Sequence, residues 1–367
     1  MRAGSFNLIV SLLLLISSAA CSSEEGRKEQ MVNLQVITDN PEAQLTNLTA
    51  AIERSRHDGS LYARRAIVLL RKGELEEALT DADLAVKLSK NNPAALFVKA
   101  QVLYALGQPD EALPLALRAE RNSYQSASLY VLLSELYLQR KDFRQARAYV
   151  NRALEISPAD EYAFYYRGRI QAETSDTSRA IGSYKAALEQ APDFMEPQRE
   201  LAGLYLARND VASATPYVEA ARKLAPDDAL LWFYQGRLYQ LRQKQDSAMV
   251  FFEQALALND SLQVAHFQYG LGLYKRGDNE GAVLHLEQAA KEYRMHPPYI
   301  TTLAGAYERL GLYRNALQQY QRLVTLDPRY SFAYQSISRL KFKLEGRRTS
   351  TDTATVEKLK ILDFNIN

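Results

Sequence analysis

Cysteine is nearly absent from this chain of 367 residues, which contains a single one, Cys21. One cysteine excludes an internal disulfide framework and any cysteine-rich metal site. Histidine is also scarce, and none of the four histidines has a metal-binding partner at helical spacing; they are His57, His266, His285 and His296. We therefore expect no metal ion and no cofactor.

An excess of either charge sign is missing as well, because the formal net charge is only +2. A nearly neutral chain sets up no overall field that favours nucleic acid, so we expect no nucleic-acid partner. The 12 prolines and 16 glycines are spread along the chain, so no low-complexity linker divides it. After residue 20, no apolar run approaches the roughly 18 residues that a membrane span needs.

Sequence motifs of catalysis are missing too. The chain has no phosphate-binding glycine loop, no GxSxG elbow and no HExxH motif. Paired acids such as Glu76 and Glu77 fall on predicted outward helix faces, where solvated charge is the ordinary interpretation. We therefore predict that the protein is not an enzyme.

The first twenty residues are typical of an export signal. Arg2 gives a positive start, residues 6–16 form a short apolar core, and residues 17–20 are small. Residues 18–21 resemble the lipobox of bacterial lipoproteins, in which Cys21 would carry the lipid and become the mature N-terminus. Two or three acyl chains anchor a protein stably, since each buried CH₂ contributes about 0.8 kcal/mol. The alternative is a secreted protein cut after Ala20.

The residues after the cysteine bear on location. Ser22 stands where inner-membrane lipoproteins of enteric bacteria carry an aspartate, which favours the outer membrane. Glu24 and Glu25 resemble the acidic surface-export cluster of Bacteroidetes lipoproteins, although a solvated tether has the same composition. The resemblance therefore implies an outer-membrane lipoprotein of the cell envelope, facing either the periplasm or the cell surface.

What the chain does have is a strict period of 34 residues, at which an alanine recurs eight times; these alanines are the main series that is listed below. A small residue also stands twelve positions before each alanine of this series, and another stands seven positions after it in all but the last repeat. Small residues at fixed places in a helical repeat allow two helices to approach closely. The main series is Ala78, Ala112, Ala146, Ala180, Ala214, Ala248, Ala282 and Ala316.

This pattern resembles the tetratricopeptide-repeat family, whose repeat is a helix-turn-helix of 34 residues. The resemblance implies an all-α fold, a right-handed α-solenoid of eight repeats with half-repeat caps at both ends. The division that we predict is 1–20 signal peptide, 21–39 polar tether, 40–58 capping helix, 59–330 eight repeats, 331–346 capping helix, and 347–367 polar tail with a short terminal helix. Asn40 is the expected N-cap of the first capping helix, with Pro41 in its first turn.

In the family, the first helix of each repeat lines a groove through its second, fifth, sixth, ninth, twelfth and thirteenth residues. Those positions carry many aromatic residues and arginines here, the residue types that dominate protein-binding hot spots. The alternative is that the tyrosines pack between adjacent helices and the arginines pair with glutamates such as Glu173, Glu196 and Glu200. The candidate binding residues are Phe97, Tyr104, Tyr162, Tyr165, Tyr166, Arg169, Arg199, Phe233, Tyr234, Arg237, Phe267 and Tyr274.

The function that we predict from these features is a lipid-anchored scaffold, attached to the membrane through Cys21. It would bind protein or peptide segments in its groove during assembly of a cell-envelope complex. The alternative is a surface-exposed lipoprotein that captures an extracellular peptide or glycan. The sequence identifies neither the partner nor the oligomeric state.

Overall fold

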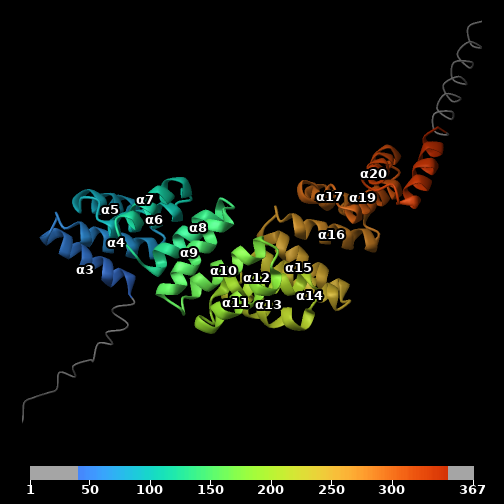
Figure 1. The fold of residues 1–367 in the computed structure, drawn as a ribbon. Helices are drawn as coiled ribbons and strands as arrows, with labels where there is room; N and C mark the ends of the chain where they lie inside the picture. Colours follow the sequence, from blue (N-terminus) through green and yellow to red (C-terminus); the bar gives the residue numbers. More distant parts are fainter. Residues whose placement is uncertain (1–39, 346–367) are drawn as a thin grey trace, which may run out of the picture. The chain divides into compact units, whose positions relative to one another are not determined.

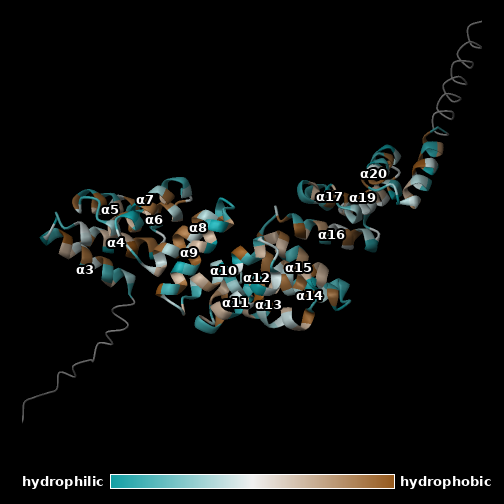
Figure 2. Cartoon of the chain, in the orientation of Figure 1, coloured by the Kyte–Doolittle hydropathy of each residue, from teal (hydrophilic) through white to brown (hydrophobic). Residues whose placement is uncertain are grey.

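A computed structural model describes residues 40–345, and every regular element in that range is an α-helix (Figure 1). The prediction of an all-α repeat fold is confirmed. The helices carry both apolar and polar residues along their length (Figure 2). The predicted signal peptide, the predicted tether with Cys21 and the predicted tail from residue 347 lie outside the described residues.

Eight pairs of helices follow a capping helix, α3 (Pro41–Arg54), and a helix over residues 331–345 follows the last pair. The first helices of the pairs are α4 (Gly59–Lys72), α6 (Pro93–Ala105), α8 (Ala127–Gln139), α10 (Glu161–Glu173), α12 (Met195–Ala207), α14 (Ala229–Leu241), α16 (Gln263–Arg276) and α19 (Pro297–Arg309). The second helices are α5 (Leu75–Leu88), α7 (Pro109–Arg121), α9 (Phe143–Ile156), α11 (Thr177–Gln190), α13 (Val211–Leu224), α15 (Gln245–Leu258), α17 (Asn279–Gln288) with its extension α18 (Ala290–Tyr293), and α20 (Tyr313–Leu326).

The helices form two compact units that divide within α8, between residues 136 and 137. Unit 1 contains α3 to α7 and most of α8. Unit 2 contains the end of α8 and all later helices. Within each unit, the two helices of a pair pack against each other and against the next pair.

The core is built where the 34-residue series places small side chains. All eight alanines of the main series are fully buried. At Gly168 and Gly236 the two helices of a repeat approach so closely that a Cβ there would lie 2.6 Å from the ring of Tyr184 or of Phe252. The small residues therefore mark the contact between the two helices of a repeat, as the spacing predicts.

A second regularity is the turn between the two helices of each repeat. One residue of this turn, at a constant repeat position, has a positive φ of 56° to 89° in all eight repeats. Only four repeats have glycine there, which adopts this conformation without steric cost. These residues are Gly73, Gly107, Lys141, Ser175, Asn209, Gln243, Gly277 and Gly311.

Side chains also fix the start of the capping helix α3 and of several first helices. Asn40 accepts hydrogen bonds from the backbone N–H groups of Glu42 and Ala43, which confirms the predicted N-cap. At the fourth position of four repeats, a polar side chain donates to the carbonyl oxygen six residues earlier. The pairs are Tyr62 to Arg56, Gln198 to Pro192, Trp232 to Pro226 and His266 to Asp260, at 2.6 to 3.2 Å.

In residues 40–345, no helix combines the length and the apolar character that a membrane crossing requires.

Candidate protein-binding surfaces

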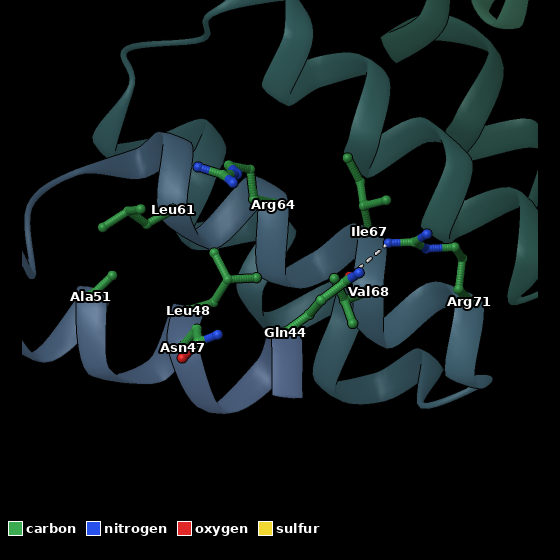
Figure 3. A pocket seen from close by; sticks show the side chains of 9 residues that line it. All are labelled: Gln44, Asn47, Leu48, Ala51, Leu61, Arg64, Ile67, Val68 and Arg71. Atoms are coloured by element: carbon green, nitrogen blue, oxygen red, sulfur yellow. Dashed lines mark hydrogen bonds between the residues drawn. The ribbon is translucent and has the colours of Figure 1, made fainter. Parts of the chain in front are cut away.

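Unit 1 has a groove of about 550 Å³ between the capping helix α3 and the first helix α4 (Figure 3). Leu48 and Val68 contribute apolar lining, and Ile67 is 37% exposed beside them. Arg64 and Arg71 supply positive charge on the same helix, at the sixth and thirteenth positions of the first repeat. Arg71 Nη2 donates to Gln44 Oε1 across the groove at 3.1 Å. The surface can therefore hold an apolar side chain between two guanidinium groups.

Four of the aromatic residues that we named as candidate groove residues lie in the core. Phe97, Tyr165, Phe233 and Phe267 are only 4–6% exposed. They share the fifth position of the first helix, and this position faces aromatic rings further along the chain. Tyr165 lies 5.3 Å from Phe194, Phe233 lies 5.5 Å from Phe252, and Phe267 lies 4.2 Å from Tyr293 between ring centroids. Phe97 likewise contacts Tyr124 at 5.3 Å. The burial of these four residues contradicts their placement on an open groove and fits the alternative, packing between helices.

The remaining candidates are at least partly accessible. Tyr162 is 51% exposed and its ring lies 4.9 Å from Phe194. Tyr104 is half-buried in unit 1. Tyr274 is half-buried in unit 2, where the guanidinium of Arg309 lies 4.1 Å from its ring centroid.

Five half-buried residues form the surface that we call the Arg–Tyr face of unit 2. Each stands at or next to the sixth or the ninth position of the first helix of its repeat. They are Tyr166, Arg169, Arg199, Tyr234 and Arg237. They come from α10, α12 and α14, so neighbouring repeats contribute to one surface.

Acidic residues balance part of the positive charge of this face. Arg199 Nη1 lies 2.9 Å from Asp228 Oδ2, and Asp228 also caps α14 through the N–H of Leu230. Burial raises the pKa of the Glu200 carboxyl, while the nearby Arg169 and Arg199 act in the opposite direction. Sequence reasoning missed Asp228, although its place directly before a first helix is a signal for an N-cap.

Tyr234 owes its position to a glycine in the preceding repeat. A Cβ on Gly203 would lie 2.6 Å from the Tyr234 hydroxyl oxygen, so a larger residue there would displace the end of this tyrosine. Burial is the main cause that raises the pKa of Tyr234 to about 12, and the charge of Glu200 adds to it. The phenol therefore stays protonated at neutral pH and can donate a hydrogen bond.

Arg237 differs from Arg199 because no carboxylate in residues 40–345 pairs with it. Its Nη1 donates to Gln240 Oε1, and Gln240 in turn donates to Gln268 at 3.0 Å. Burial lowers the pKa of Arg237, and the nearby Tyr293 side chain acts in the opposite direction. A half-buried guanidinium of this kind has hydrogen-bond donors left for an external carboxylate or carbonyl oxygen.

In residues 40–345, no three His, Cys, Asp or Glu side chains come together as potential metal ligands. His266 is buried, and its Nδ1 lies 2.9 Å from Nδ1 of His285. Because His266 Nε2 donates to the Asp260 carbonyl oxygen, His266 Nδ1 accepts a hydrogen bond from the Nδ1–H of His285. The pair packs α16 against α17.

Comparison with known proteins places these surfaces on a repeat scaffold. One tetratricopeptide-repeat model matches residues 97–161, 131–193 and 267–331, and a second matches residues 172–238. Together the matched segments cover more than half of the chain.

Among curated proteins, human protein O-mannosyl-transferase TMTC1 is 25% identical over 192 residues, which is 51% of this chain. The chain spans only 22% of that relative's length.

Two solved structures share the fold at low identity. The crystal structure of the APC/C hetero-tetramer Cut9–Hcn1 has a TM-score of 0.60 at 16% identity, covering 83% of this chain and 60% of the other. The structure of Pseudomonas aeruginosa PilF has a TM-score of 0.52 at 20% identity, covering 60% of this chain and 97% of the other. At these identities the likeness concerns the fold.

Proposed function

This chain belongs to the tetratricopeptide-repeat family, and we propose that it is a lipid-anchored scaffold that binds protein or peptide segments for assembly of a cell-envelope complex. Scaffolds with these repeats generally bind protein partners and catalyse no reaction. The fold also occurs in a subunit of a hetero-tetramer, the APC/C assembly Cut9–Hcn1.

The observation that carries the binding proposal is the difference between Arg199 and Arg237 on the Arg–Tyr face. Arg199 already has an internal carboxylate, Asp228, whereas Arg237 is half-buried without one. Tyr234 lies one turn away on α14 and offers an apolar ring with a protonated hydroxyl. An extended peptide segment could place an apolar side chain on Tyr234 while Arg237 takes its carbonyl or carboxylate oxygen.

A single substitution tests this surface. Arg237→Gln removes the charge and keeps a side chain that can hydrogen-bond to Gln240. We expect partners recovered from crosslinked cells to bind about tenfold more weakly, which corresponds to about 1.4 kcal/mol. Arg314→Gln, an exposed arginine on the second helix α20, is the matched control. Equal recovery with both variants would contradict the proposed binding surface.

The lipid anchor is supported by the lone cysteine that follows a small-residue cleavage zone. A palmitate analogue fed to cells should label the wild type and not Cys21→Ala, and the variant should leave the membrane fraction. Equal labelling of both would end the lipoprotein proposal. Protease treatment of intact cells then separates the two orientations, because it degrades a surface-exposed lipoprotein and spares one that faces the periplasm.

A further inference from the structure

The fourth repeat lacks a contact that its neighbours share. In the third, fifth and sixth repeats, two aromatic rings stack between the first and the second helix, with interplanar angles of 8° to 11°. In the fourth repeat, Gln171 and Ser183 occupy these two places. Ser183 Oγ donates to Gln171 Oε1 at 2.7 Å. The three stacked pairs are Tyr137 with Tyr149, Tyr205 with Tyr217, and Tyr239 with Phe251.

A cavity of about 150 Å³ lies beside these smaller side chains, between α9, α10 and the start of α11. Gln171 is part of its lining, and three arginines surround it, Arg147, Arg167 and Arg179. The single acid in the lining is Asp176, whose Oδ2 lies 3.4 Å from Arg179 Nη1. The cavity therefore carries more positive than negative charge.

The first repeat shows how a carboxylate neutralises an arginine at the repeat position of Arg167. Arg65 stands three periods earlier, and its Nε and Nη2 donate to the two carboxylate oxygens of Asp81 at 2.6 and 2.8 Å. Asp81 occupies the repeat position of Ser183. In the fourth repeat, Arg167 Nε donates instead to the neutral hydroxyl of Ser183, at 3.1 Å.

Neither Arg167 nor Arg147 forms an ion pair with any described residue. The Arg167 guanidinium lies 4.8 Å from the centroid of the Phe164 ring, and burial lowers its pKa with no carboxylate to oppose the effect. Uncompensated charge in a partly buried place is costly, and a bidentate anion relieves that cost best.

We propose that this cavity is a binding site for one carboxylate group, held by Arg167 as Asp81 is held by Arg65. A cavity of about 150 Å³ is large enough for benzene, so a carboxylate on a short side chain fits. Arg147 is exposed and the Arg179 side chain is 79% exposed, so the site is open to solvent. An acidic side chain of a protein partner and a free small acid share this chemistry. The site is separate from the Arg–Tyr face and does not depend on the proposed function.

Two variants of the full chain test the site with succinate as the probe, against sodium chloride at matched ionic strength. Arg167→Gln removes the charge, and Gln235 stands at the same position two repeats later, so the fold should tolerate it. Ser183→Asp supplies the internal carboxylate of the first repeat. Succinate should raise the melting temperature of the wild type by about 2 °C. The rise should vanish in both variants, and Ser183→Asp should melt higher than the wild type without succinate.

The same succinate response in Arg167→Gln as in the wild type overturns the proposal, whether or not Ser183→Asp folds. The proposal is also overturned if phosphate gives a larger difference in the rise of the melting temperature between wild type and Arg167→Gln than succinate does. The site would then be a phosphate site. Two capped pentapeptides with a central Glu or Gln distinguish the sources. If the wild type binds the Glu peptide at least tenfold more tightly than the Gln peptide, the site is assigned to a protein side chain. A response to succinate alone assigns it to a free acid.

Discussion

Replacement of Gly168 by alanine is the sharpest test of how the two helices of a repeat meet. A Cβ at this position would lie 2.6 Å from Cδ1 and Cε1 of Tyr184, whereas carbon atoms normally approach to about 3.5 Å. Tyr184 is completely buried, so its ring cannot move into solvent. Overpacking of this kind costs about 1–3 kcal/mol.

Gly182, in the second helix of the same repeat, is the matched control. It is exposed, and a Cβ there would have no neighbour within 4 Å. Alanine in place of glycine inside a helix stabilises by about 1 kcal/mol in both helices, so this contribution cancels between the two variants. The difference in unfolding free energy between Gly168→Ala and Gly182→Ala should therefore be about 1–3 kcal/mol, with Gly168→Ala less stable.

Urea unfolding followed by far-ultraviolet circular dichroism measures this difference through the transition midpoints. Tyr184→Val in the Gly168→Ala background gives a further check, because the fifth repeat pairs alanine with valine at these two positions (Ala202 and Val218). The tyrosine substitution should cost about 0.5–3 kcal/mol less in this background than in the wild type. Equal midpoints for the two alanine variants would refute the inferred contact.

The helix positions follow from the sequence because the repeat spacing reflects a strong steric constraint. Two helices can approach at Ala180 or Ala214 only if the side chain is small, so the spacing of these alanines records the packing itself. The first helices begin at residues 34 apart, from Gly59 onward. The division into two units within α8 has no counterpart in the spacing, which continues unchanged through residues 136 and 137.

The burial of individual groove residues could not be read from the same spacing. Tyr165 and Tyr166 are neighbours in sequence, but Tyr165 turns toward Phe194 and the core whereas Tyr166 stays half-buried. A tyrosine suits both places because it has an apolar ring and a polar hydroxyl. The glycine that makes room for Tyr234 lies 31 residues earlier, at Gly203, and no local pattern connects the two.

The carboxylate site proposed in the fourth repeat did have a signal in the sequence. Gln171 interrupts a stripe of otherwise apolar residues and tyrosines that runs through all eight repeats. An isolated polar residue in such a stripe indicates either a solvated position or a buried polar contact. Only the contacts of Ser183 with Arg167 and Gln171 decide between the two.

Two further predictions concern buried polar groups. Tyr184→Phe should stabilise the chain by about 1 kcal/mol in urea unfolding, because the buried Tyr184 hydroxyl has no hydrogen-bond partner among the described residues. Phe252 fills the same repeat position two repeats later. A loss of stability would show that the hydroxyl is bonded. The last prediction concerns acidification. Burial lowers the pKa of His285 below its usual 6.5, and the neighbouring His266 lowers it further, while Asp278 and Glu253 act in the opposite direction. Between pH 6.5 and the folded-state pKa of His285, the unfolded chain therefore binds a proton that the folded chain does not bind. The stabilisation of the folded state is complete above pH 6.5 and is lost as the pH falls through the folded-state pKa. His285→Gln removes this titration, so its melting temperature should fall less than that of the wild type between pH 7.5 and pH 5. Parallel decreases in the two proteins would mean that protonation of His285 does not oppose folding.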